Sequence, residues 1–343
     1  MSERKLATVQ TISAIADIVG ADFIGLATFN SIGWQCVVKK SDFKPGYKCV
    51  FFEIDSLVPD TEPFAFLQGK RRIRSMKLKG TLSQGLALPL SAFEIYGVDS
   101  DNWTHETEPV DGDDLTEALG VEQYEPPQSG QPGYSSGPPE GSAPFPFFLG
   151  LKKTDEERIQ SSPKLLEDLA GLSYTVTVKL DGQSATYAWT KDSGLIVCSR
   201  NLWIQQEDNS SFWQVARNMG LDTLTEFSGL AIQGEVCGPG IQGNKLGLKE
   251  LNFFVFNLFD MEKKEYLNPD SVIKVCSSLS LPSVPVAERK TKFKHTQDSL
   301  LELARGNYLG TKTPREGIVV RSNDGVVSFK VINNDFLLHY KGE

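Results

Sequence analysis

Residues 174–190 read YTVTVKLDGQSATYAWT, and this stretch decides how the second half of the chain folds. Apolar and β-branched residues stand on both sides of Lys179-Leu180-Asp181-Gly182, so the pattern predicts two strands joined at that tetrapeptide. Further strands are predicted at 194–199, 230–236, 253–259, 317–322 and 326–331, and helices at 154–160, 162–171 and 212–220. Because helical and extended stretches are interleaved, we expect an α+β domain built on antiparallel sheets.

The first hundred residues contain short extended stretches. They are rich in Val, Ile and Phe, are separated by turns such as KPGYK, and lie at 9–18, 24–29, 34–40, 48–54 and 85–90. This spacing predicts a small closed sheet, and an OB-like β-barrel is the usual one of this size. Residues 126–147 are rich in Pro, Gly and Ser, as linkers are. We therefore expect an OB-like nucleic-acid-binding domain at 1–125, a linker at 126–147 and a second domain at 148–343.

The chain is acidic overall but carries one basic cluster. Its net charge is −9, yet residues 69–80, GKRRIRSMKLKG, contain no acid and these six cations: Lys70, Arg71, Arg72, Arg74, Lys77 and Lys79. We expect the cluster on or beside a connecting loop, where OB-like barrels often bind oligonucleotides. Phosphate binding depends on the local patch and not on the total charge, so RNA contact is predicted here. The alternative is a solvated hairpin.

Several other classes of protein are disfavoured. No apolar run approaches the roughly 18–20 residues of a membrane span. The start, MSERKLATVQ, lacks the apolar region of a signal peptide, so we expect a cytoplasmic, intracellular chain without a membrane partner. Five widely spaced cysteines without a CxxC pair argue against a disulfide framework and a zinc ribbon, and three scattered histidines argue against a histidine-based triad. No obligatory protein partner is evident.

Five short motifs follow one another in the second half of the chain. They are Lys179 to Gly182, Ser199-Arg200, Gly234-Glu235, FFVFN at 253–257, and the pair formed by EGIVVR at 316–321 and Ser328-Phe329-Lys330. A lone KxDG tetrapeptide is weak evidence, but the ordered set is strong. The set resembles the covalent nucleotidyltransferase superfamily of ATP-dependent ligases and mRNA capping enzymes. GPGIQ after Glu235 and the FFVFN segment look particularly like RNA ligases.

The order of the two predicted domains also carries a resemblance. Only 13 residues follow Lys330, which leaves no room for the OB domain that DNA ligases and capping enzymes place there. An OB-like domain at the N-terminus looks like the clade of RNA ligases that begin with one. This family often has a second lysine two residues after the first in its last motif, but here Ile332 stands in that place.

The resemblance implies roles for individual residues. Lys179 is the nucleophile that takes AMP from ATP. A lysine must be neutral to attack, which costs about 4–5 kcal/mol at pH 7, and a nearby Mg²⁺ or Mn²⁺ lowers that cost. Oxygen ligands suit such an ion, so Asp181, Glu235 and Glu316 are the candidate metal ligands, and Glu235 and Glu316 the candidate catalytic carboxylates.

The remaining candidates surround the nucleotide. Gly182 lets the chain turn close beneath it, Asp181 and Glu235 also contact the ribose in some members, and Arg200 holds the ribose or the RNA 3′ end. Phe256 stacks on the adenine, although a core role is the alternative. Lys330 contacts the α-phosphate and assists catalysis. Arg321 is a basic residue at a place where related ligases often have one, and Arg158 reaches the β and γ phosphates.

These features predict an ATP-dependent RNA ligase. It joins RNA 3′-hydroxyl and 5′-phosphate ends through lysyl-AMP and RNA-adenylate intermediates, and the resemblance favours nicks in duplexes. One alternative is a DNA ligase or a GTP-using capping-type nucleotidyltransferase. A second alternative is a nucleic-acid-binding protein whose transferase domain is inactive.

Overall fold

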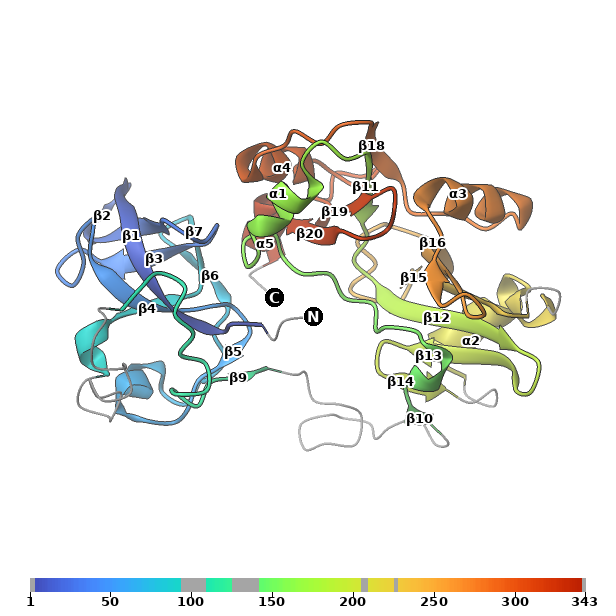
Figure 1. Cartoon of the computed structure of the whole chain (residues 1–343), viewed down its shortest axis with the longest axis horizontal. Coiled ribbons are helices and arrows are strands. Elements are labelled where there is room, and N and C mark those ends of the chain that lie inside the picture. The colour runs from blue at the N-terminus through green and yellow to red at the C-terminus, as the bar shows by residue number, and fades with distance from the viewer. Residues whose placement is uncertain (1–3, 94–108, 125–141, 205–208, 225–227, 341–343) are drawn as a thin grey trace. The chain divides into compact units, whose positions relative to one another are not determined.

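The structure is a computed structural model that describes residues 4–93, 109–124, 142–204, 209–224 and 228–340. It divides into two compact units (Figure 1). Unit 1 contains residues 1–126, 159–164 and 334–343, and unit 2 contains residues 127–158 and 165–333. The domain boundaries stated above remain a prediction, and most of the predicted linker lies outside the described residues.

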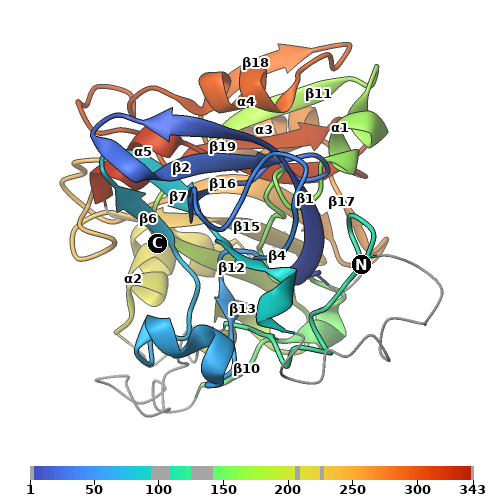
Figure 2. The ribbon, with the colours of Figure 1, turned by 90° about the vertical axis from the view of Figure 1, so that its left-hand side faces the viewer.

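Unit 1 is built on a five-stranded antiparallel sheet in the order β3-β2-β1-β4-β8. Its strands are β1 (Ala7–Ile18), β2 (Ala21–Phe29), β3 (Gln35–Lys39), β4 (Lys48–Phe52) and β8 (Leu86–Pro89). The central strand β1 pairs with β2 through its second half and with β4 through its first half. Two register shifts in β1 let it bend, and Figure 2 shows it curving through the sheet. The five predicted strands are confirmed.

A smaller hairpin in unit 1 lies outside the five predicted strands and overlaps the basic cluster, where a hairpin is named only in the alternative. It consists of β6 (Ser75–Leu78) and β7 (Thr81–Gln84). Lys79 and Gly80 form its turn with φ angles of 49° and 81°, the left-handed pair that two-residue hairpins prefer. A further two-stranded pair joins β5 (Ser56–Leu57) to β9 (Glu122–Gln123).

Unit 2 contains two antiparallel sheets. The seven-stranded sheet has the order β10 (Ala143–Pro144), β14 (Leu202–Ile204), β13 (Gly194–Ser199), β12 (Gln183–Thr190), β15 (Leu230–Cys237), β16 (Asn252–Asp260) and β17 (Glu265–Tyr266). The four-stranded sheet has the order β18 (Val286–Lys290), β11 (Tyr174–Lys179), β19 (Gly317–Ser322) and β20 (Ser328–Ile332). All seven strands predicted for this half are confirmed, and the class is α+β.

The described helices are short: α1 (Lys164–Leu169), α2 (Ser211–Asn218), α3 (Pro269–Ser278), α4 (Gln297–Ala304) and α5 (Asn334–Tyr340). Helices α2 and α3 cover the seven-stranded sheet, where Trp213 and Val272 join a core with Tyr187 and Phe253. Asn268 caps α3 and Thr296 caps α4 with side-chain oxygens that accept backbone N–H bonds.

The predicted helix at 154–160 was wrong. Residues 155–157 have no regular secondary structure, Arg158 forms an isolated parallel bridge with Lys330, and the Lys330 amide donates to the Glu157 carbonyl at 2.7 Å. Charged residues favour a helix locally, but pairing beside β20 supplies the backbone hydrogen bonds instead. Within the described residues, no helix combines the length and the apolar character needed to cross a bilayer.

Candidate active site

The Lys179 motif lies where the two sheets of unit 2 meet. Lys179 is the last residue of β11 in the four-stranded sheet, and Gln183 is the first residue of β12 in the seven-stranded sheet. Residues 180–182 therefore carry the chain from one sheet to the other. Side chains of both sheets can converge on this crossing.

Strand register brings Glu316 to the lysine. Lys179 pairs with Gly317, the first residue of β19, so Glu316 stands next to the end of β11. The Lys179 ammonium donates to Glu316 Oε1 at 2.6 Å, and Glu316 is only 3% exposed. The contact joins the predicted nucleophile to a predicted catalytic carboxylate 137 residues further along the chain.

Glu235 approaches the same crossing from β15. The Gly182 amide donates to Glu235 Oε1 at 3.0 Å. A Cβ at Gly182 would lie 2.4 Å from the Val236 carbonyl oxygen, so glycine is required here by close packing against β15. Burial raises the pKa of Glu235 to about 7; nearby Lys179 and the Gly182 amide oppose that rise, while Glu316 and Asp181 add to it.

Two residues that the sequence did not single out hold this crossing in place. The Lys245 ammonium forms an ion pair with Asp181. The buried Tyr308 hydroxyl oxygen accepts the backbone amides of Asp181 and Glu316, each at 3.1 Å. The run GPGIQGNK offered a signal for Lys245, because it begins three residues after Glu235. No sequence signal marked Tyr308.

Two of the cations predicted to contact the nucleotide or the RNA end meet at Asp155. Lys330 donates to Asp155 Oδ1 at 2.9 Å and Arg200 donates to Asp155 Oδ2 at 2.7 Å. Burial lowers the pKa of Lys330, and the charges of Lys179 and Arg158 lower it further, against the effect of Asp155. Burial alone would raise the pKa of Asp155, but Lys330 and Arg200 hold it below its usual range. The structure thus brings these predicted cations together.

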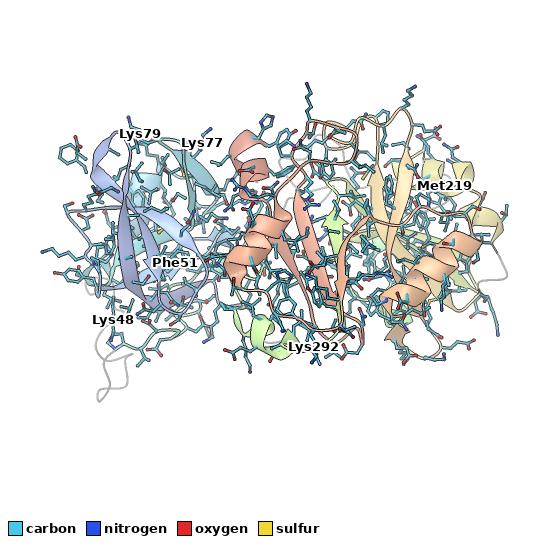
Figure 3. The ribbon with its side chains drawn as sticks, turned by 90° about the horizontal axis from the view of Figure 1, so that it is seen from above. Lys48, Phe51, Lys77, Lys79, Met219 and Lys292 are labelled. Atoms are coloured by element: carbon cyan, nitrogen blue, oxygen red, sulfur yellow. The ribbon has the colours of Figure 1, made fainter. Side chains whose placement is uncertain are left out.

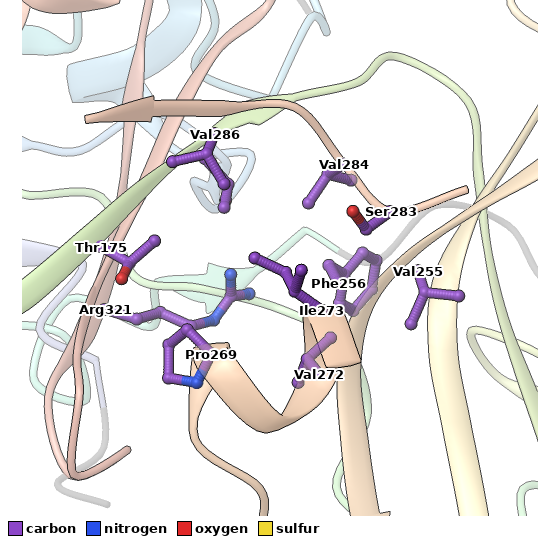
Figure 4. A pocket seen from close by; sticks show the side chains of 11 residues that line it. Thr175, Val255, Phe256, Pro269, Val272, Ile273, Ser283, Val284, Val286 and Arg321 are labelled. Carbon is purple, nitrogen blue, oxygen red and sulfur yellow. The ribbon is translucent and has the colours of Figure 1, made fainter. Parts of the chain in front are cut away.

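Phe256 and Arg321 line one pocket, which Figure 4 shows. The Arg321 guanidinium carbon lies 5.7 Å from the centre of the Phe256 ring, and its Nη2 donates to Glu156 at 2.8 Å. The other lining residues are mainly small and apolar: Thr175, Thr177, Val255, Pro269, Val272, Ile273, Ser283, Val284 and Val286. An apolar slot with few polar groups suits a flat ring. Thr175 and Thr177 alternate on β11 with Lys179, so the three share one face.

The residues present fit a divalent cation only in part. Among the described residues, no three His, Cys, Asp or Glu side chains form a group that could hold a metal ion by themselves. Glu316 and Asp181 contact ammonium groups and Glu235 contacts a backbone amide. Carboxylate oxygens nevertheless suit Mg²⁺ and Mn²⁺, and Mg²⁺ usually takes one or two of them together with water and phosphate oxygens. The site therefore fits an ion that arrives with a phosphate ligand.

The basic cluster of unit 1 separates into two groups. Lys70, Arg74, Lys77 and Lys79 are exposed, and Figure 3 shows Lys77 and Lys79 at one edge of the unit with Lys48 at the opposite edge. Arg71 donates to the Val58 carbonyl at 2.6 Å. Arg72 donates twice to Asp55, and its guanidinium carbon lies 4.0 Å above the Tyr124 ring. Arg71 and Arg72 thus also have contacts within the fold.

The chain has a small β-barrel unit, and then a two-sheet unit with a lysine at the sheet crossing. This arrangement is that of a covalent nucleotidyltransferase of the ligase type. The comparisons with known proteins agree. A family model described as RNA ligase matches residues 172–332, and an OB-fold domain model matches residues 6–90.

Solved structures match nearly the whole chain. A Naegleria gruberi RNA ligase mutant without ligand is 35% identical, with 99% of each chain covered and a TM-score of 0.81. A mutant of that ligase with ATP and Mn is 35% identical over 98% of this chain and 99% of that chain, with a TM-score of 0.80. The same ligase with PPi is 35% identical over 99% of each chain, with a TM-score of 0.79. No curated protein matched significantly. The chain belongs to the RNA ligase family.

Proposed function

We propose that this ligase uses ATP to join RNA ends, with Lys179 as the residue that carries AMP. The contact between Lys179 and Glu316 is the observation that supports this assignment most directly, because the lysine donates to a buried carboxylate at the sheet crossing. The Naegleria gruberi enzyme has been captured with ATP and Mn, with AMP and Mn, and with PPi. These are the substrate, the transferred group and the leaving group of such a step.

In the first step, the Lys179 ammonium loses a proton to water, and the neutral amine attacks the α-phosphorus of ATP and releases a second proton to water. An N–P bond forms, the bond from the α-phosphorus to the bridging oxygen breaks, and pyrophosphate leaves with that oxygen. Lys330 and Arg158 lie side by side and stabilise the negative charge of the phosphates. Arg200, which shares Asp155 with Lys330, holds the ribose or the RNA 3′ end. Phe256 and Arg321 hold the adenine in the pocket between β11, β16 and α3.

A divalent cation, Mg²⁺ or Mn²⁺, would be held by Asp181, Glu235 and Glu316 with water and phosphate oxygens, and would neutralise phosphate charge. AMP then passes from Lys179 to an RNA 5′-phosphate, forming a diphosphate bond and restoring the amine. Finally an RNA 3′-hydroxyl attacks that 5′-phosphate and AMP leaves. We propose nicks in duplexes as the preferred substrate, with the exposed cations of unit 1 binding RNA phosphates.

The first step is tested by incubating the protein with ATP and Mg²⁺ or Mn²⁺ and locating the adduct by mass spectrometry. One AMP on Lys179, lost on acid treatment as a phosphoramide is, supports the proposal. Labelling with GTP in parallel tests the capping-type alternative. An adduct on another lysine, or an adduct that persists in Lys179→Ala, contradicts the assignment. Sealing assays on nicked and single-stranded RNA then decide the substrate.

A further inference from the structure

Lys245 lies outside the five motifs, yet its ammonium contacts the carboxylate of Asp181. Lys245 Nζ donates to Asp181 Oδ2 and also to the Gln242 carbonyl at 2.8 Å. The two charged side chains are only 16% and 13% exposed, so the ion pair is largely shielded from water. Buried ion pairs are costly to form without good geometry, which makes an incidental contact between residues 64 positions apart a poor explanation.

The loop that carries Lys245 is braced in an unusual conformation. Gln242 and Asn244 have left-handed backbones, with φ angles of 45° and 47°. The Asn244 side chain accepts the Leu248 amide at 3.0 Å and donates to the Leu248 carbonyl at 2.8 Å, which closes the loop upon itself. Non-glycine residues in this region cost about 1–3 kcal/mol each and cluster at functional sites. The loop therefore fixes the position of the Lys245 ammonium.

The surrounding charges explain what this ammonium does. Glu235 accepts the amide of Gly182, the residue next to Asp181, and the amides of Asp181 and Glu316 donate to the same Tyr308 hydroxyl, so two further carboxylates lie near Asp181. Without a cation, Asp181 would face two like charges at low exposure and would turn away from them. Lys245 opposes that repulsion and fixes the plane of the Asp181 carboxylate through Oδ2. The backbone amide of Asp181 is held separately by Tyr308.

We propose that Lys245 is a positioning residue of the nucleotide site: by holding Oδ2 of Asp181, it presents the other carboxylate oxygen to a ribose hydroxyl of ATP. This inference rests on the proposed function, in which Asp181 lies at the nucleotide. The loop after β15, which carries Lys245, would then help the site to select ATP over deoxynucleotides. A site built to bond a hydroxyl discriminates strongly against a substrate that lacks it.

Two measurements test the role of Lys245. In the first, lysyl-AMP formation is followed in wild type, Lys245→Met and Lys245→Arg with ATP, 2′-deoxy-ATP and 3′-deoxy-ATP. We expect Lys245→Met to raise KM for ATP about tenfold, the lower end for residues that orient a binding group, with a smaller change in kcat. Its preference for ATP over at least one deoxy analogue should fall, and Lys245→Arg should restore part of it. In the second, Kd values for the same nucleotides are measured in a Lys179→Ala background, where no turnover occurs.

Matched variants separate positioning from general loss of charge or fold. Lys249 is exposed in the same loop, so Lys249→Met removes the same charge and should change neither KM nor discrimination. Asp181→Asn should lose the same discrimination, and combining it with Lys245→Met should add little, because coupled residues are not additive. If Lys245→Met does not fold, Lys245→Gln replaces it. Unchanged KM and discrimination in a folded Lys245 variant overturn the inference while wild-type lysyl-AMP formation still supports the proposed function. A wild type that forms no lysyl-AMP overturns both.

Discussion

Lys179 Nζ lies 2.6 Å from Glu316 Oε1, so the proposed nucleophile donates a hydrogen bond to a buried carboxylate. An ammonium that donates to a carboxylate has no free electron pair with which to attack phosphorus. Glu316 therefore holds the lysine in position, and the ammonium must lose a proton before it can attack. This pairing leads to the first prediction.

Replacing Glu316 by Gln should slow lysyl-AMP formation at least tenfold, the scale of residues that orient a metal or a ligand. Glutamine keeps the size of the side chain but removes the charge that pairs with Lys179. Glu235→Ala should have an effect of the same order. Initial rates of label transfer from ATP measure the change. Glu302→Gln on α4 is the control, because that carboxylate is exposed and pairs with the neighbouring Arg305. Normal rates in both Glu316 and Glu235 variants would show that the site is wrongly assigned.

A second prediction concerns the Tyr308 hydroxyl. Its oxygen accepts the backbone amides of Asp181 and Glu316, so Tyr308→Phe leaves both amides without this acceptor. A buried group that loses its partner costs about 1–3 kcal/mol, and we expect a loss of about 2 kcal/mol in the free energy of unfolding. Lysyl-AMP formation should also slow, because the two amides belong to site residues.

Tyr47→Phe provides the control for Tyr308, since Tyr47 is 51% exposed. Urea unfolding and adenylylation rates should be measured on the same preparations. If Tyr308→Phe lowers the free energy of unfolding but not the adenylylation rate, Tyr308 has only a packing role. If it changes neither quantity, the hydrogen bonds to the two amides are contradicted.

The sequence predicts the parts of this site that local patterns mark. It misses the parts that depend on contacts between residues far apart along the chain. Lys179 was found because alternating residues and a tetrapeptide motif are local signals. Tyr308 and Asp181 are 127 residues apart, and no sequence pattern near Tyr308 predicts their hydrogen bond. The helix predicted over 154–160 failed because its charged residues favour a helix locally, whereas pairing of Arg158 with Lys330 is a long-range interaction. Helices α3 and α4 were missed although Asn268-Pro269 and Thr296 are helix-start signals.

The third prediction concerns acid stability at the edge of the four-stranded sheet. Glu288 accepts hydrogen bonds from Lys290 at 2.6 Å, from His295 at 2.7 Å and from the Tyr174 hydroxyl. Burial alone would raise the pKa of Glu288, but these donors outweigh it and lower the pKa to about 2. Because the folded pKa lies below the unfolded value of roughly 4.3, this carboxylate stabilises the fold above that value and loses its effect as pH falls toward 2.

Glu288→Gln isolates this contribution. The difference in unfolding free energy between wild type and Glu288→Gln should be about 1.5–3 kcal/mol near pH 6, the range for hydrogen bonds to charged groups. It should shrink steadily between pH 5 and pH 3 on urea titration at each pH. A difference that stays constant over this range would show that the charge of Glu288 is not involved.

The fourth prediction separates RNA binding from chemistry. Arg74 and Lys77 are exposed in unit 1, on or beside the β6–β7 hairpin. Arg72 instead donates to Asp55 and stacks on the Tyr124 ring. The double variant Arg74→Gln/Lys77→Gln should bind RNA more weakly and seal it more slowly, with lysyl-AMP formation unchanged. Each lost phosphate contact removes close to one unit from the slope of log affinity against log salt.

Lys39→Gln/Lys44→Gln is the matched control for that variant, since both lysines are exposed in the same unit and the charge removed is equal. If only net charge mattered, the two double variants would weaken RNA binding alike. If the hairpin contacts phosphates, only Arg74→Gln/Lys77→Gln flattens the salt dependence, by about one to two units. Arg72→Ala should behave differently from both, because losing its bonds to Asp55 and its stacking on Tyr124 lowers stability before it affects binding. Measuring RNA affinity at several salt concentrations, together with the unfolding midpoint of each variant, distinguishes these outcomes, and equal slopes in all variants would show that the hairpin cations do not bind RNA.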